Sequence, residues 1–279
     1  RMFQETQIDY AQERKSVMSM ARTLGLKVPG LRPSVTLVDF SVTVPAQGDS
    51  WDQRYAPRLR YGAQATGGGQ VFEAMDDIDF SSAYSTGGVP NRLILPNIDV
   101  NGVLVNYTIV KRELVINGAT KIFKRVINGS DVKPFLEMIL PEQNVLSVES
   151  IITKEGTNLV TAPTLDEYID FENRWFEMDS LAEDKVFIED TTRQADNPGV
   201  KMGKWVDTTQ RFYKEFTDTG FCKMTFGSGN AGEDLFAQFG KNAFTQQIGD
   251  FINTTALGEI PAANSTMYVR YRVGGGSNS

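Results

Sequence analysis

A glycine-rich run after an apolar segment is the feature of this sequence most typical of a cofactor site. The run Gly227–Gly232 has the spacing GxGxxG, and Asp250 follows at about the distance of a ribose-binding acid. In a dinucleotide site, however, the glycines open an apolar helix inside a β-α-β unit. Here Glu233 and Asp234 come next, and the sequence after them has no series of parallel strands. We therefore predict a turn between strands, and no cofactor.

Carboxylates concentrate between Asp166 and Asp190, where aromatic residues are interleaved with them. Two suitably spaced carboxylates could act as the acid and base of glycoside hydrolysis, with candidates at Glu167, Asp170, Glu172 and Glu177. A run of acids is more typical of a solvated face or of a docking site for a basic partner. A second acidic run, Asp76–Asp79, lacks the glycine and the distal glutamate of a calcium loop. We predict neither a catalytic residue nor a metal site.

The composition excludes several other classes of site. The 279 residues contain no histidine and one cysteine, Cys222, which excludes Ser-His-Asp and Cys-His catalysis, histidine-ligated zinc and an internal disulfide. Lysine and arginine number 28 against 35 acids, so the net charge of −7 offers no basic footprint for nucleic acid. The sequence also lacks the long apolar run of a membrane span. We predict a protein that is not an enzyme and binds neither nucleic acid nor membrane.

The elements that must position any site begin with a helix. Residues from Met2 to Leu24 lack glycine and proline, and Gly25 and Pro29 then end the segment, which predicts one helix with an apolar stripe in its second half. From Pro33 to Pro45 the period changes to two, with Val38, Phe40, Val42 and Val44 on one side, which predicts a half-buried strand. Residues 47–69 predict an irregular loop whose aromatic residues pack against their own domain.

Asn-Gly pairs dominate the next part of the chain. They lie at Asn101-Gly102, Asn117-Gly118 and Asn128-Gly129 between β-branched runs, a strong hairpin signal. We predict an antiparallel meander from about Leu93 to Ile152, with Pro134 and Pro141 at edges or strand ends. Further strands are predicted at Arg211–Phe216, Phe221–Phe226 and Thr266–Val273.

These patterns predict a mainly β (α+β) fold, with an N-terminal helix followed by antiparallel meanders in two or more elongated subdomains with long loops. The predicted divisions are a helical segment at 1–32, a β-rich domain at 33–160, and an acidic segment with a second β-rich part at 161–279. The sequence starts at Arg1 and stops in a Gly-Ser run, so we expect the chain to continue beyond Ser279 in a longer protein.

Four stretches together resemble the baseplate wedge and baseplate-J-like proteins of contractile-tailed bacteriophages. They are the helix-to-strand segment Arg14–Val44, the segment Gly69–Ser82, the Phe-Gly-x-Gly turn within Met224–Asp234, and the Tyr-Arg-x-Gly-Gly segment within Asn264–Ser279. The resemblance implies a structural subunit of the virion, assembled in the host cytoplasm. Such a subunit would pair with copies of itself and with other wedge, hub or sheath-initiator proteins, form a ring around the tail hub, and rearrange on contraction.

Residues that could contact partners are apolar positions of the predicted helix and one face of the last predicted strand, because arginine and tyrosine are frequent interface anchors. The candidates are Phe3, Ile8, Val17, Met18, Tyr268, Arg270 and Arg272. An alternative function is a tail protein that binds or cleaves glycans, in which Trp175 of the acidic segment would hold the sugar.

Overall fold

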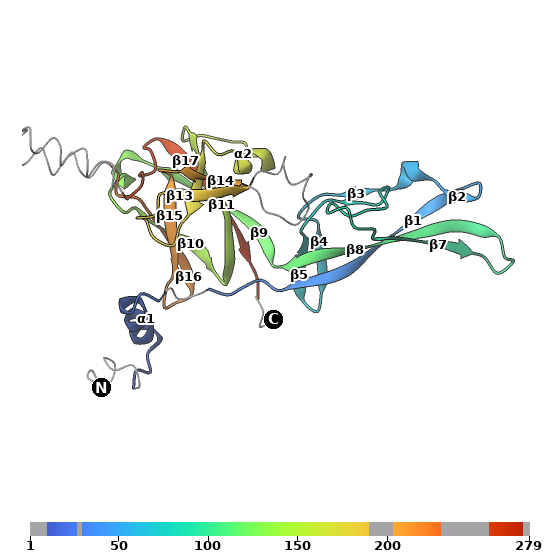
Figure 1. Ribbon diagram of the computed structural model, residues 1–279, viewed down its shortest axis with the longest axis horizontal. Coiled ribbons are helices and arrows are strands. Elements are labelled where there is room, and N and C mark those ends of the chain that lie inside the picture. The colour runs from blue at the N-terminus through green and yellow to red at the C-terminus, as the bar shows by residue number, and fades with distance from the viewer. Residues whose placement is uncertain (1–9, 27–29, 190–202, 230–256, 276–279) are drawn as a thin grey trace, which may run out of the picture. The chain divides into compact units, whose positions relative to one another are not determined.

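The computed structural model describes residues 10–26, 30–189, 203–229 and 257–275, and it is mainly β with a short N-terminal helix (Figure 1). The predicted fold class is therefore confirmed. The chain divides into two compact units. We call residues 1–30 and 122–271 the barrel unit, and residues 31–121 and 272–279 the sheet unit.

The sheet unit contains an antiparallel half-barrel in the order β2-β1-β8-β5-β4, with β7 also paired to β8. A small separate sheet joins β3 to β6, and a 3₁₀ turn, η2, lies between β2 and β3. The bounds are β1 Val35–Gln47, β2 Ser50–Trp51, η2 Gln53–Tyr55, β3 Arg58–Leu59, β4 Gln64–Gly67, β5 Gln70–Ala74, β6 Ile78–Asp79, β7 Arg92–Ile98 and β8 Leu104–Asn117.

The long strand β8 organises this unit. One edge of β8 pairs with β1 from Val35 opposite Ile116 to Pro45 opposite Asn106, and β7 and β5 share the other edge. The alternation predicted for β1 is confirmed, because Val38, Phe40, Val42 and Val44 are more buried than the residues between them. In Figure 1 the three strands β1, β7 and β8 run together, and the turn between β7 and β8 projects past the neighbouring strands.

The core of the sheet unit lies under one face of β1 and β8. Val44 and Ile109 pack there with Trp51 of β2, Ile78 of β6 and Phe80, which follows β6. Trp51 is buried as predicted for the aromatic loop, whereas Tyr55 is exposed. The prediction of a wholly irregular loop is wrong, because residues 47–69 contribute short strands and a 3₁₀ turn.

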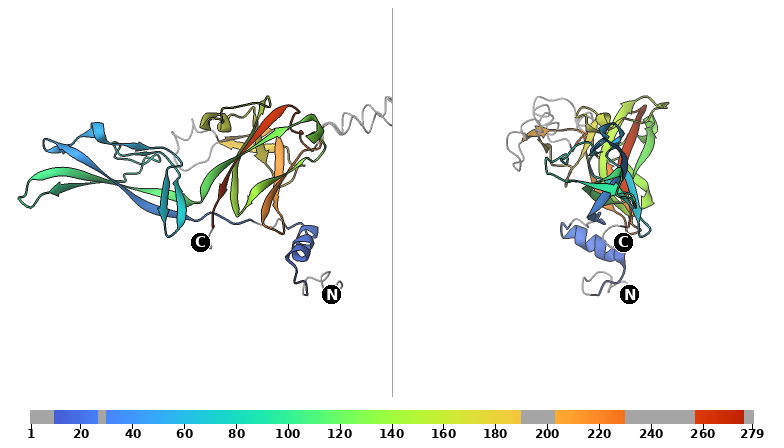
Figure 2. Two further views of the ribbon diagram at one scale, coloured as in Figure 1. Left: turned by 180° about the vertical axis from the view of Figure 1, so that it is seen from behind. Right: turned by 90° about the vertical axis from the view of Figure 1, so that its right-hand side faces the viewer.

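The barrel unit contains a nearly closed mixed barrel in the order β10-β16-β15-β12-β11-β17-β9, in which β12 and β15 run parallel. Figure 2 shows β11, β17 and β9 following one another along its wall. The bounds are α1 Arg14–Thr23, β9 Ala119–Ile127, η3 Gly129–Asp131, β10 Glu137–Gln143, β11 Val145–Glu155, α2 Leu165–Ile169, β12 Arg174–Glu177, β13 Lys185–Glu189, β14 Gly203–Asp207, β15 Arg211–Phe216, β16 Phe221–Phe226 and β17 Ser265–Val273.

Helix α1 is shorter than predicted within the described residues, because residues 10–13 precede it without helical structure. Its end is as predicted: Gly25 has a φ of 77°, and the Leu26 N–H donates to the carbonyl of Ala21. Glycine favours this left-handed conformation, which satisfies the last carbonyls of a helix. No helix among the described residues has the length and apolar character needed to cross a membrane.

The predicted meander is wrong beyond its first hairpin. Asn101-Gly102 joins β7 to β8 as a hairpin, but the Asn117 and Gly118 N–H groups donate to the carbonyls of Ser34 and Val71. The chain therefore passes from one sheet into the other between β8 and β9. Asn128-Gly129 leads into η3, whose helical backbone differs from the left-handed conformation that a two-residue hairpin turn needs.

The observed division of the chain also differs from the predicted boundary near residue 160. Ile151 of β11 pairs with Trp175 of β12, so the segments on both sides of residue 160 belong to one sheet. Composition changes there because the chain leaves the barrel wall for an exposed connection. Pro141 lies in β10, which ends the strand order, and the strands predicted at Arg211, Phe221 and Thr266 are confirmed.

Candidate interaction surface

The face of the sheet unit opposite its core carries the most distinctive surface of the described residues. We call it the outer face, and it is formed by alternate residues of three strands. They are Leu37, Asp39, Ser41 and Thr43 of β1, Thr108, Val110, Arg112 and Leu114 of β8, and Leu93 and Leu95 of β7.

Four leucines of the outer face are exposed: Leu37 is 59% exposed, Leu93 55%, Leu95 43% and Leu114 48%. Leu37 lies opposite Leu114, and Leu93 lies opposite Val110. Since the other face of these strands packs on the core, apolar side chains lie on both sides of the sheet. That pattern is typical of sheets covered on both faces, whereas a one-sided antiparallel sheet presents polar residues to solvent.

A single ion pair crosses the outer face between its apolar rows. Asp39 and Arg112 lie opposite each other, and Nε and Nη2 of Arg112 donate to Oδ1 and Oδ2 of Asp39 at 2.6 and 2.8 Å. These hydrogen bonds, and the charge of Arg112, hold the pKa of Asp39 below its ordinary value. The carboxylate in turn raises the pKa of Arg112. This bidentate contact orients both side chains at the surface.

Polar side chains form the edge of the outer face nearest to the β7–β8 turn. Asn97 Nδ2 donates to Oδ1 of Asn106 at 2.6 Å and to Oγ1 of Thr108 at 2.8 Å. In the turn, Asp99 Oδ1 accepts the N–H groups of Asn101 and Val103, each at 2.8 Å. These backbone donors, Val103 first, lower the pKa of Asp99. The side chain of Asp99 therefore stabilises the turn in which it lies.

The tip of this hairpin adds further apolar surface. Ile98, Val100, Val103 and Val105 are all exposed, and Val100 is fully exposed. Hairpin turns usually carry polar residues, since their backbone and side chains face water. Aliphatic residues on a turn fixed by Asp99 are suited to insertion between or against neighbouring chains.

A buried ion pair lies at the opposite end of the outer face. Glu73 and Arg272, both 3% exposed, are joined at 2.8 Å, and Glu73 also accepts the Thr120 N–H and hydroxyl at 2.8 and 2.6 Å and Gln64 Nε2 at 3.2 Å. Burial alone would raise the pKa of Glu73, but these hydrogen bonds and the charge of Arg272 outweigh it, so the pKa is lowered. The pair is structural, because its donors and acceptors are used within the sheet unit.

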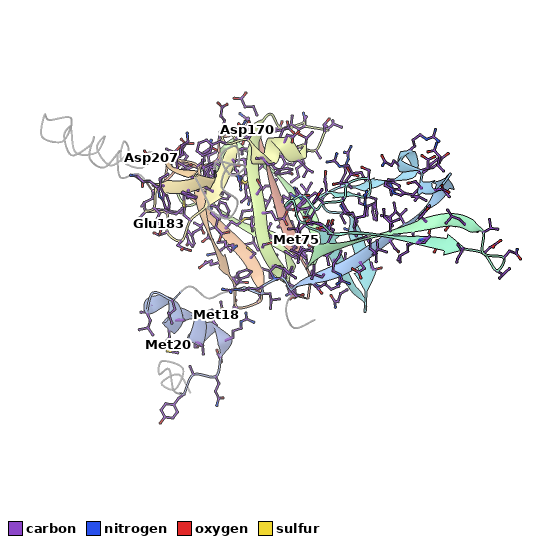
Figure 3. The ribbon with its side chains drawn as sticks, turned by 45° about the vertical axis from the view of Figure 1, so that its right-hand side comes forward. Met18, Met20, Met75, Asp170, Glu183 and Asp207 are labelled. Carbon is purple, nitrogen blue, oxygen red and sulfur yellow. The ribbon has the colours of Figure 1, made fainter. Side chains whose placement is uncertain are left out.

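The candidates from the sequence lie elsewhere. Phe3 and Ile8 lie outside the described residues. On α1, Val17 is exposed, whereas Met18, which is labelled in Figure 3, is buried.

On β17, Tyr268 and Arg272 are buried and Arg270 is ion-paired with Glu149 at 3.1 Å. The alternating face predicted for β17 is thus used within the chain. It was predicted as available because alternation alone does not distinguish an outer strand face from one covered by other segments.

The described part of the acidic segment carries exposed carboxylates and a buried tryptophan. Asp170 and Glu183 are exposed at the outside of the barrel unit, as is Asp207 (Figure 3). Among the described residues no group of acids and cysteine is arranged to hold a metal ion. Trp175 is buried, and its Nε1 donates to Oγ1 of Thr153 at 2.6 Å. It therefore offers no platform for a sugar ring.

The described part of the glycine motif forms a turn held by backbone contacts. The N–H groups of Gly227 and Gly229 donate to the carbonyls of Glu259 and Gly258, so they do not point to a phosphate. Gly232 and Asp250 lie outside the described residues. Cys222 is buried in β16, and burial raises the pKa of its thiol to about 12, as suits an inert core residue.

Sequence reasoning missed the outer face because β1 by itself alternates cleanly, with Asp39, Ser41 and Thr43 pointing to solvent. The available signal was in the neighbouring strands: Leu93 and Leu95 share a face at period two, as do Val110 and Leu114. Only the register brings these residues beside Leu37.

The chain was also compared with known proteins. It matches no protein-family model. No curated protein is significantly similar to it.

Proposed function

We propose that this chain is a structural, non-enzymatic subunit that assembles with other proteins through the outer face of its sheet unit. The class of assembly proposed is the one that the sequence resemblance implies: the baseplate wedge of a contractile phage tail, built in the host cytoplasm. There the chain would form part of a ring around the tail hub and rearrange when the tail contracts.

The observation that supports this proposal is the apolar outer face, with its four exposed leucines. Burying a leucine side chain completely contributes roughly 1.5–3 kcal/mol. Leu37, Leu93, Leu95 and Leu114 are each about half exposed, so a partner covering them would gain about 1 kcal/mol per leucine. That gain favours association with a partner that covers the four leucines.

Hydroxyl-radical footprinting tests the proposal. The four leucines are oxidised in the isolated chain and compared with the same residues in the native particle, with the fully buried Leu140 as the unreactive reference. We expect oxidation of the four leucines to fall several-fold in the particle. Equal oxidation in both samples would show that the outer face stays open, and the proposal would fail.

A further inference from the structure

We infer that the free backbone edge of β1 is a second binding site, which takes an extended strand of another protein with a basic residue opposite Asp39. This site differs from the outer face, because main-chain groups make the contact and the partner lies beside the sheet. The inference therefore goes beyond the proposed function and does not depend on the kind of assembly.

Strand β1 has one neighbour along most of its length in the described part of the chain. It pairs with β8 from Val35 to Pro45, and with β2 at Ala46 and Gln47. Among the described residues, no second strand pairs with β1 between Val35 and Val44. One edge of this stretch is therefore open to a further strand.

Hydrogen bonds at the two ends of β1 show which backbone groups face the free edge. The Ser34 carbonyl accepts from the Asn117 N–H on the side of β8, whereas the Pro45 carbonyl accepts from the Asp52 N–H on the opposite side. Because the backbone groups of successive residues in a strand point to opposite edges, the odd-numbered residues of β1 face the free edge. They are Val35, Leu37, Asp39, Ser41 and Thr43, each with an N–H and a C=O group.

The free edge of β1 lacks the features that usually keep strand edges from pairing. Such edges are short, or they carry proline, lysine or a bulge. Strand β7 has Pro96 and β10 has Pro141, each with a shift in register, and β4 is 4 residues long. Between Val35 and Val44, β1 has no glycine, proline or lysine, and its register with β8 is continuous. This edge is therefore suited to the mode of recognition in which an extended segment adds a strand to a sheet.

The side chains beside the free edge define the chemistry of the added strand. Phe40 and Val42 are half-buried and pack on the core, so the residues that extend this face are apolar. On the outer face, Arg112 binds Asp39 from β8, and a carboxylate can accept further hydrogen bonds. A lysine or arginine opposite Asp39 on the free side would give this row alternating charges, and such cross-strand pairs are stabilising.

A second copy of β1 fits the free edge less well than a strand with this pattern. When the edge residues of two copies overlap fully in antiparallel pairing, Asp39 of one copy lies opposite Asp39 of the other. Like charges directly opposite each other are destabilising. The strand therefore comes from a different protein.

Synthetic peptides test this inference on the full chain. The probe has about 10 residues, the upper length of common strands, and alternates valine with threonine, with lysine in place of one central threonine. A second peptide carries glutamate at that position. With the lysine peptide at millimolar concentration, we expect slower hydrogen exchange of the Leu37, Asp39, Ser41 and Thr43 amides. The Phe40 amide, which faces β8, is the slow reference. The glutamate peptide should bind about 5-fold more weakly.

Modified peptides separate main-chain pairing from side-chain contact without changing the protein. In the predicted register the threonine N–H groups face β1, and the valine N–H groups face away. A lysine peptide N-methylated at its threonines should therefore bind at least about 10-fold more weakly than one N-methylated at its valines. In the protein, Ser41→Pro removes an N–H from the free edge and should weaken binding to the same extent, whereas Ser41→Ala keeps the N–H and the affinity. Circular dichroism confirms that both variants fold.

Edge amides that exchange at the same rate with and without the lysine peptide overturn the inference, as does equal binding of the two N-methylated peptides. Equal binding of the lysine and glutamate peptides overturns the basic residue opposite Asp39. Self-association of the chain without peptide, lost in Ser41→Pro, would place a second copy on the edge and overturn the different partner. The oxidation of the four leucines in the native particle depends on none of these results, so the proposed function is tested separately.

Discussion

Replacing Glu73 tests how the buried ion pair holds the sheet unit. Its carboxylate accepts four hydrogen bonds, two from Thr120 and one each from Gln64 and Arg272. Glu73→Ala removes all four acceptor contacts and leaves the Arg272 guanidinium 3% exposed beside the carbonyl of Gly118. Breaking a buried pair by removing one partner costs about 3–5 kcal/mol. We expect Glu73→Ala to lose that much free energy of unfolding.

The paired replacement separates a buried charge from a lost contact. Glu73→Leu combined with Arg272→Met removes both charges, and apolar replacement of a buried pair is often close to neutral. The Thr120 N–H still loses its acceptor, which costs about 1–3 kcal/mol. The double variant is therefore expected to be more stable than Glu73→Ala.

Urea denaturation of the full chain measures these losses, and hydrogen exchange of the Thr120 amide reports the sheet unit locally. Lys214→Met is the control, because its ion pair with Glu177 is only partly buried and contributes up to about 1 kcal/mol. The lowered pKa of Glu73 also predicts how stability depends on pH. The free energy of unfolding that the Glu73 carboxylate contributes is complete above its ordinary pKa of 4.5 and is lost as the pH falls through the lower folded pKa. A Glu73→Ala chain within about 1 kcal/mol of wild type would refute the reasoning.

Three further predictions test the packing. In chemical denaturation, Trp175→Ala should lower the free energy of unfolding by about 3–5 kcal/mol, because Trp175 is buried. Trp205 is exposed in a cross-strand aromatic pair, so Trp205→Ala should lower it by at most about 1 kcal/mol. Equal losses in the two variants would contradict the burial pattern. Gly227→Ala places a Cβ 2.2 Å from the backbone of Gly258, so Tm should fall by several degrees, and an unchanged Tm would contradict this contact. Cys222, with a pKa of about 12, should resist iodoacetamide until urea unfolds the chain; rapid labelling of the native chain, seen by mass spectrometry, would be inconsistent with its burial.

Local patterns in the sequence were sufficient for individual elements. The period-two alternation from Val38 to Val44 identified the buried side of β1, and Gly25 marked the end of α1. Apolar and aromatic runs located β15 and β16. These signals succeed because each depends on a few neighbouring residues whose backbone preferences agree with the final structure.

Pairing between distant segments could not be derived in the same way. Asn117 and Asn128 carry the same hairpin signal as Asn101, yet the chain after each of them joins a different neighbour. Glu73 and Arg272 are 199 residues apart, and nothing local to either position indicates the other. The outer face is likewise a product of register, because its residues come from three strands.

An image of the native particle at a resolution that separates strands tests the central claim most directly. The account predicts copies of the chain repeating around the tail axis, with density from a neighbouring chain covering Leu37, Leu93, Leu95 and Leu114. Copies that are absent from the tail, or present with this face open to solvent, would contradict it.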